Sequence, residues 1–243
     1  MKRPSVFIIK NTRAILMKHK KLWVAGLLLS LNAVSASATL FDRGNGLIYD
    51  SAQKITWLQD ANYAKTSLYD SDGLMTWNDA TVWAAGLVYQ GYSDWRLPTT
   101  TDTGTSGCDF AYSGTDCGSN VATNSSELAR LFFIDLGNLS SYDTAGSLRG
   151  GISGVDWGVV NSGPFSNLQN YAYWSGSEYA PSTRNAYIFF TSLGYQYAVY
   201  KNYSLYAWAV RSGDVAANNN VPEPGTLALL SLGLLGLRRA QRR

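Results

Sequence analysis

The chain has 243 residues, of which 46% are hydrophobic and 13% aromatic, so it is long enough for one packed domain and too apolar for a disordered or fibrous protein. Its formal net charge is +3, but residues 39–217 contain 9 basic and 16 acidic residues, a net charge of −7. This acidic middle excludes nucleic acid as a partner, because binding to phosphates needs clustered Lys and Arg on a folded surface.

The N-terminus predicts a secretory signal peptide over residues 1–38. Seven basic residues lead into an apolar run at 22–31, and Ala36 and Ala38 then form an A-x-A motif for signal peptidase. A transmembrane anchor is the alternative, but this run is about half of the roughly 20 apolar residues that a membrane span requires. The one histidine, His19, lies in this segment. After cleavage no imidazole remains for a Ser-His-Asp triad or a His-ligated metal site.

The exported part, residues 39–217, begins with a predicted hairpin and a helix. Residues 47–49 and 55–58 are β-type runs separated by a turn-type segment. The helix begins at Thr76, which caps it with Asp79 three positions on, and apolar residues at helical spacing continue it until Gly91.

A short buried strand at 95–97, ended by Pro98, precedes a polar insertion over 99–124. Cys108 and Cys117 are the two cysteines of the chain, and an oxidising compartment favours a disulfide between them. A reactive thiol is the alternative, but the flanking residues include no basic side chain that would favour a thiolate.

The same insertion contains three aspartates, Asp102, Asp109 and Asp116. Carboxylate oxygens in a Gly-rich loop are ligands for calcium, although the spacing is not that of an EF-hand. Solvated loop acids are the alternative. We therefore expect no cofactor, with calcium as the one metal that the loop would suit.

The second half predicts one more helix and a group of strands. The helix begins at Asn124 or Ser125, with Glu127 in its first turn, and ends near Gly137, and residues 140–169 are irregular. The strands are expected at 171–175, 185–191, 195–200 and 205–211. The pattern predicts a single α+β domain with two helices, short mostly antiparallel strands and long irregular loops.

Tyrosine is unusually frequent, with 16 in the chain, all of them in residues 39–217. Tyr195 and Tyr197 share one face of a predicted strand, and Tyr203 follows shortly after. Such a surface would stack sugar rings or contact another protein. The alternative is that these rings fill a core that is poor in Leu and Ile.

The C-terminal segment, 218–243, has three parts in a fixed order. Pro222, Glu223 and Pro224 precede an apolar run at 226–237, and four arginines follow at Arg238, Arg239, Arg242 and Arg243. Arginines after a short apolar helix act as a stop-transfer element. The order resembles the PEP-CTERM sorting signal. The resemblance implies processing by an exosortase, transient attachment to the inner membrane, and export through the periplasm to the surface of a Gram-negative bacterium. An uncleaved anchor would also place residues 39–217 outside the cytoplasm.

Three blocks of the middle carry a second resemblance. They are 46–50 with 55–60; 75–80 with 91–99 and 126–128; and 173–177 with 207–211. The motif residues are Asp94, Trp95, Arg96, Pro98, Trp174 and Arg211. The blocks resemble the Lcl C-terminal domain family, named after a collagen-like bacterial adhesin. The resemblance implies a C-type-lectin-like fold, related to the formylglycine-generating enzyme domain. The adhesin member of the family is associated with sulfated polysaccharides and with biofilm. The acidic domain disfavours a sulfated ligand.

Several residues have a structural alternative to a functional role. Arg96 is interpreted as a structural arginine held by a carboxylate such as Asp94, rather than as a ligand contact. The tripeptide 77–79 matches a calcium-binding motif of lectins, but it opens a helix and is interpreted as local helix chemistry. Glu127 and Glu178 are the two glutamates of the domain, and a glycan hydrolase would need such a pair.

From these patterns we expect an exported, non-enzymatic protein of the extracellular matrix that binds exopolysaccharide or a surface protein. A self-assembling structural protein and a carboxylate-dependent hydrolase are the alternatives.

Overall fold

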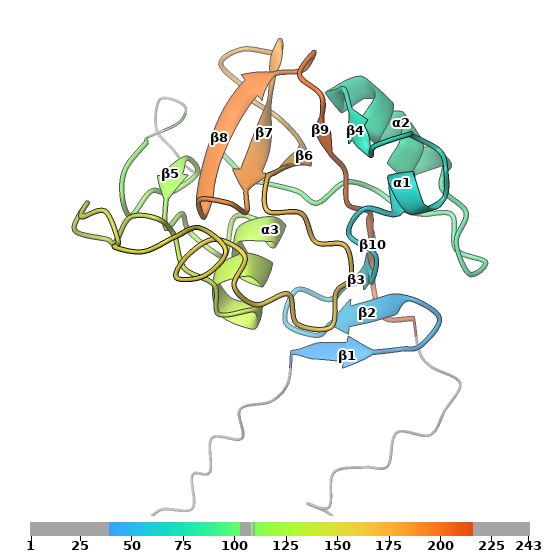
Figure 1. Cartoon of the computed structure of the whole chain (residues 1–243). Coiled ribbons are helices and arrows are strands. Elements are labelled where there is room, and N and C mark those ends of the chain that lie inside the picture. Colours follow the sequence, from blue (N-terminus) through green and yellow to red (C-terminus); the bar gives the residue numbers. More distant parts are fainter. Residues whose placement is uncertain (1–38, 103–107, 109, 216–243) are drawn as a thin grey trace, which may run out of the picture. The chain divides into compact units, whose positions relative to one another are not determined.

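The computed structural model describes residues 39–102, 108 and 110–215. In this part the chain forms two β-sheets and three short α-helices (Figure 1). The predicted α+β class is confirmed, with three helices in place of the two expected. The predicted boundaries at 38 and 217 and the whole C-terminal segment lie outside the described residues.

The smaller sheet joins the start of the domain to its end. Its strands are β1 (Leu40–Asp42), β2 (Leu47–Asp50), β3 (Ile55–Leu58) and β10 (Val210–Ser212), antiparallel in the order β1-β2-β3-β10. The predicted β2–β3 hairpin is confirmed. Its turn is fixed by Asp50, whose Oδ1 accepts hydrogen bonds of 3.0 Å from the N–H groups of Ala52 and Gln53.

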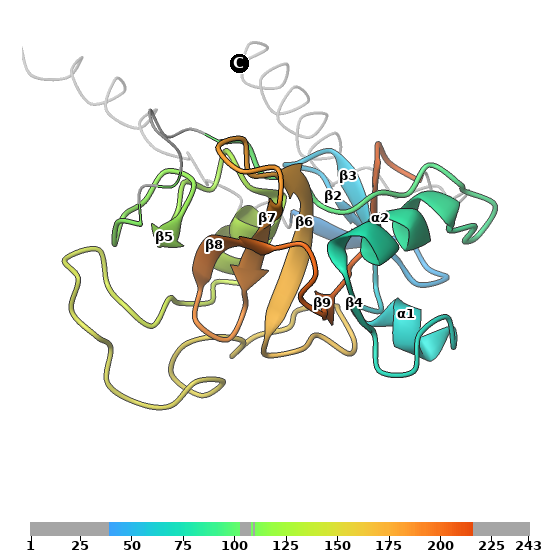
Figure 2. The ribbon, with the colours of Figure 1, turned by 90° about the horizontal axis from the view of Figure 1, so that it is seen from above.

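The larger sheet has the order β4-β9-β6-β7-β8-β5. Its strands are β4 (Leu74–Met75), β5 (Gly118–Ser119), β6 (Ala172–Glu178), β7 (Asn185–Phe190), β8 (Tyr195–Tyr200) and β9 (Leu205–Tyr206). All pairs are antiparallel except β6 with β9. Seen from above, α1 and α2 lie on the β4 side of the central strands and β5 lies on the opposite side (Figure 2).

The single strand predicted at 205–211 is wrong, because the chain divides it between the two sheets as β9 and β10. Trp208 lies at the division and is fully buried. Its Nε1 donates a 2.7 Å hydrogen bond to the carbonyl oxygen of Leu58 on β3 of the smaller sheet, and its ring lies 5.8 Å from that of Tyr173 on β6 of the larger sheet. This tryptophan therefore joins the two sheets.

The helices are α1 (Tyr63–Thr66), α2 (Trp77–Gly86) and α3 (Glu127–Arg130), and α3 continues as a π-helical turn, η1 (Leu131–Asp135). Thr76 caps α2 as predicted, since its Oγ1 accepts from the N–H of Asp79 at 3.3 Å. The helix ends at Gly86, before the predicted end at Gly91, because Leu87 is extended. Among the described residues no helix is long and apolar enough to span a bilayer.

The start of the third helix also differs from the prediction. Ser126 is the cap, in place of Asn124 or Ser125, and its Oγ accepts a 3.2 Å hydrogen bond from the N–H of Ala129. The same hydroxyl donates to Oε1 of Gln196 on β8 at 2.7 Å. A contact 70 residues away in the chain thus decides which of three polar residues becomes the cap.

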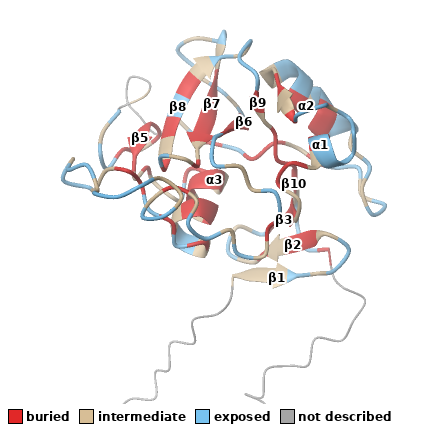
Figure 3. Ribbon diagram, viewed as in Figure 1, coloured by how far each residue is buried: buried red, intermediate tan, exposed pale blue. Residues whose placement is uncertain are grey.

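Buried residues gather where the two sheets and the helices meet (Figure 3), and the largest of their side chains are aromatic. The largest fully buried side chains include Trp57, Trp174, Trp208, Tyr173 and Tyr187. Trp57 and Trp208 have ring centroids 4.8 Å apart. Some tyrosines therefore fill the core, which is the alternative interpretation of the high tyrosine content, while others remain at the surface.

Candidate functional site

The two tyrosines predicted to share a strand face do so on β8. The ring centroids of Tyr195 and Tyr197 are 6.1 Å apart and their planes differ by 33°. Tyr195 is half-buried and Tyr197 is 36% exposed. Tyr203 is exposed too, but it follows the end of β8 and does not lie with the other two.

Tyr195 lines a cavity of about 530 Å³, which we call the aromatic pocket. Its lining residues are Phe110, Ala111, Tyr112, Ser119, Ser141, Tyr142, Leu148, Trp157, Leu193 and Tyr195. They come from the insertion with β5, from β8 and the turn before it, and from the irregular segment after η1. None of these lining side chains is charged at neutral pH.

Two pairs of aromatic rings lie at this pocket. Phe110 contacts Tyr197 at the rim, with centroids 5.2 Å apart, and Tyr112 contacts Tyr142, with centroids 5.0 Å apart. Phe110 is 51% exposed and Tyr112 is 47% exposed. The pocket therefore offers accessible ring surface rather than a closed apolar core.

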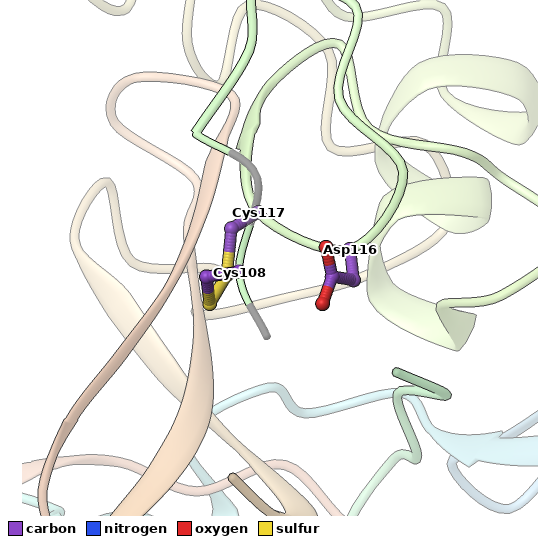
Figure 4. A group of neighbouring side chains, drawn as sticks. All are labelled: Cys108, Asp116 and Cys117. Carbon is purple, nitrogen blue, oxygen red and sulfur yellow. A yellow bond between two sulfur atoms is a disulfide. The ribbon is translucent and has the colours of Figure 1, made fainter. Parts of the chain in front are cut away.

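The predicted disulfide between Cys108 and Cys117 is present (Figure 4). Phe110 and Tyr112 lie between the two cysteines in the sequence. The loop is joined to its surroundings by Asn120, whose Nδ2 donates to the carbonyl oxygens of Tyr112 at 2.8 Å and Tyr142 at 3.0 Å. The amide thus holds the two halves of one ring pair in register.

Asp116 anchors the same loop to the large sheet. The residue is fully buried, and its Oδ2 accepts a 3.0 Å hydrogen bond from the hydroxyl of Tyr187 on β7. Its carbonyl oxygen accepts from Nε2 of Gln196 at 2.6 Å. Burial, the hydrogen bond to Asp116 and the nearby charge of Asp102 raise the pKa of Tyr187.

Two of the three aspartates predicted as calcium ligands, Asp102 and Asp116, thus both raise the pKa of the buried Tyr187 hydroxyl. The third, Asp109, lies outside the described residues. Donor atoms of Cys108, Asp116 and Cys117 lie within 4.8 Å of one another (Figure 4). The two sulfur atoms are bonded to each other, so neither is a thiolate that could hold a metal.

The motif residues connect distant segments of the fold. Arg211 on β10 binds Asp94 with two hydrogen bonds, of 2.7 and 3.0 Å, and its guanidinium lies 4.2 Å from the ring centroid of Tyr92. The hydrogen bonds from Arg211 lower the pKa of Asp94. The carboxylate that holds Arg96 belongs to Glu127, at 2.7 and 2.8 Å, and not to Asp94 as expected.

The remaining motif residues are buried or bonded to backbone. Trp95 is buried beside Tyr89, and Trp174 donates from Nε1 to the carbonyl oxygen of Met75 at 2.8 Å. The carbonyl oxygen of Pro98 accepts from the Oγ of Ser175 at 3.0 Å. These contacts give the motif a role in holding the fold.

The two glutamates are each ion-paired to a different basic side chain. Glu127 binds Arg96 and lines a polar cleft of about 400 Å³ together with Arg130. Glu178 binds Lys201, whose ammonium lies 4.1 Å from the ring centroid of Trp77. The structure does not bring the two carboxylates to one cleft.

Sequence reasoning missed most of the pocket. Phe110 and Tyr112 were visible as the two aromatic residues between the cysteines, a signal that could have marked them. Tyr142 and Trp157 come from the irregular segment 140–169, where no periodicity indicates which side chains face inward.

Comparison with known families gives two matches. Residues 220–243 match the PEP-CTERM protein-sorting motif. This motif implies exosortase processing and sorting to the cell surface in Gram-negative bacteria. Its proline and arginine residues, like the predicted cleavage site at Ala36 and Ala38, lie outside the described residues. Comparison with curated proteins gives no match. Residues 46–211 match the Lcl C-terminal domain, and the chain belongs to that family.

Proposed function

We propose that this chain is an extracellular-matrix protein that binds polysaccharide through the aromatic pocket and does not catalyse a reaction. In this proposal signal peptidase removes residues 1–38, an exosortase processes residues 218–243, and residues 39–217 remain as one C-type-lectin-like binding domain. The sorting motif and the family membership support the location and the domain.

The observation that carries the proposal is the pocket itself. Ligand sites in proteins are concave, have volumes of about 300–1,000 Å³, and combine apolar walls with a few polar groups. The aromatic pocket has this size and composition. Its ring pairs are held by the Cys108–Cys117 disulfide and by Asn120, so the site is formed before a ligand arrives.

Binding is favoured over hydrolysis because the glutamates are engaged elsewhere. A glycan hydrolase needs one carboxylic acid and one carboxylate flanking the same bond, about 5–10 Å apart. Glu127 and Glu178 are each neutralised by a basic partner, and neither lines the aromatic pocket.

The test is retention of the purified full chain on the exopolysaccharide of its host, with and without EDTA, while released reducing sugar is assayed. Retention without released sugar supports binding. Released sugar that disappears in a Glu127→Gln variant would support the hydrolase. Self-association with no retention would support a structural role, and EDTA sensitivity would assign calcium to the aspartate loop.

A pair of variants connects retention to the pocket. Tyr195→Ala removes a lining ring, whereas Tyr203→Ala removes an exposed tyrosine outside the pocket. The proposal predicts weaker retention for the first and unchanged retention for the second.

A further inference from the structure

We infer that the ligand of the aromatic pocket is an uncharged sugar chain, held by ring stacking and by hydroxyl hydrogen bonds. This inference rests on the proposed function, since it names the class of ligand for the same pocket. It excludes both a sulfated or uronic-acid polymer and a calcium-bridged sugar as the preferred ligand.

The first step is that no charged side chain is found among the described residues that line the pocket. An anionic group that entered would lose its hydration without gaining a cation, which is costly. Arg149 follows the lining residue Leu148 but does not itself line the pocket, and the bond from its Nε to the carbonyl oxygen of Ser140, at 3.0 Å, holds its guanidinium against the main chain. Asp143 follows Tyr142, and its Oδ1 accepts from the N–H groups of Ala145 and Ser147.

The net charge of the whole domain also disfavours an anionic ligand. Residues 39–217 have a net charge of −7, so the surrounding field repels a polyanion and leaves a neutral polymer unaffected. A neutral ligand would also make binding almost independent of ionic strength, because no ion pair is formed that salt could screen.

The second step is the supply of free hydroxyl groups. Tyr112, Tyr142, Tyr195, Ser119 and Ser141 line the pocket, and none of their hydroxyls is hydrogen-bonded to another described residue. Burial, with a smaller effect of Tyr197, raises the pKa of Tyr195 and keeps its hydroxyl neutral. Hydroxyls that donate and accept match the hydroxyls of a sugar.

The third step is the arrangement of the aromatic rings at the pocket. The ring pairs Phe110–Tyr197 and Tyr112–Tyr142 then give two stacking surfaces, so the pocket would prefer an oligomer to a monosaccharide.

The experiment is calorimetric titration of the full chain, purified in mild detergent. The probes are neutral gluco-, manno- and galacto-oligosaccharides, the corresponding monosaccharides, and an oligogalacturonate of equal length, each with EDTA. Titrations are repeated at about 50 and about 500 mM salt, where screening lengths differ by about threefold. We expect a neutral oligosaccharide to bind at least about tenfold more tightly than its monosaccharide, with a change in affinity below about twofold between the two salts.

Matched variants locate the binding. Tyr142→Ala should weaken the neutral ligand at least about tenfold, and Tyr142→Phe, which keeps the ring and tests the hydroxyl, should weaken it by about two- to fivefold. Tyr69→Ala, an exposed tyrosine outside the pocket, should leave the affinity unchanged. Circular dichroism of each variant checks that the fold is retained.

The contrary results distinguish a wrong ligand class from a wrong binding site. Preferred, salt-sensitive binding of the oligogalacturonate would overturn the neutral ligand, and its loss in Tyr142→Ala would leave the pocket as the binding site. Neutral binding that survives both Tyr142 variants would overturn the pocket. If no oligosaccharide binds, the inference fails, and the proposed function is then decided by retention on the host exopolysaccharide.

Discussion

Replacement of Glu127 by Ala is the sharpest test of how the family motif holds this fold. The Glu127 carboxylate accepts three hydrogen bonds, from Nη1 and Nη2 of Arg96 at 2.7 and 2.8 Å and from the N–H of Thr99 at 2.7 Å. The side chain is only 17% exposed, and Arg96 is 34% exposed. Removing the carboxylate leaves all three donors without this partner.

The expected cost follows from these contacts. Hydrogen bonds to charged groups contribute about 1.5–3 kcal/mol when buried, and breaking a buried ion pair costs about 3–5 kcal/mol. Arg96 is partly open to water, which offsets part of the loss, so we expect Glu127→Ala to lower the free energy of unfolding by about 2–3 kcal/mol. Glu127→Gln keeps one acceptor oxygen and should cost about 1–2 kcal/mol.

Urea unfolding measures these differences, with Asp94→Ala as the matched control. Asp94 makes a similar two-bond contact to Arg211, but its side chain is 55% exposed, and exposed pairs contribute at most about 1 kcal/mol. The reasoning is refuted if Glu127→Ala costs less than about 1 kcal/mol or no more than Asp94→Ala.

Three further predictions concern stability. Burial raises the pKa of the Asp135 carboxyl, so the stability that its neutral form contributes is complete below about pH 4 and is lost as pH rises through the raised pKa. The neutral Asp135→Asn variant should therefore raise the urea midpoint more at pH 7 than at pH 4. Equal shifts at both pH values would contradict this. A Cβ at Gly118 would lie 2.0 Å from a main-chain oxygen, so Gly118→Ala should cost more than about 2 kcal/mol, against about 1 kcal/mol for Gly137→Ala, where nothing lies within 4 Å; similar costs would refute it. Cys117→Ser should cost about 2–3 kcal/mol by denaturation without reductant and weaken retention on the ligand, and unchanged retention would show that the loop need not be closed.

Local signals accounted for the elements that the sequence predicted well. Thr76 and Asp79 are neighbours in the chain and fix the start of α2, and the β2–β3 turn needs only residues within the hairpin. The elements that were missed, β1, α1, β4 and β5, have two to four residues each, too few to show a periodicity.

Errors arose where a distant contact decided the outcome. Arg96 is two residues from Asp94, yet its partner is Glu127, 31 residues on, because the fold places the start of α3 beside the motif. Trp208 divides a predicted strand because it is buried between the sheets. Neither choice is visible in a local pattern.

The candidate site shows the same limit. The alternation along β8 places Tyr195 and Tyr197 on one face, and this was predictable from the strand alone. The partners of that face, Phe110 and Tyr142, come from segments without regular structure, so only the folded chain brings them to the pocket.

The most direct test of the central claim is to locate the bound polysaccharide by hydroxyl-radical footprinting of the aromatic side chains. Oxidation is measured with and without host exopolysaccharide, and Tyr69 and Tyr203, exposed and outside the pocket, serve as internal references for radical dose. The proposal predicts that Tyr112, Tyr195 and Tyr197 become protected relative to these references. Uniform oxidation, or protection of Tyr203 alone, would show that the aromatic pocket is not the binding site.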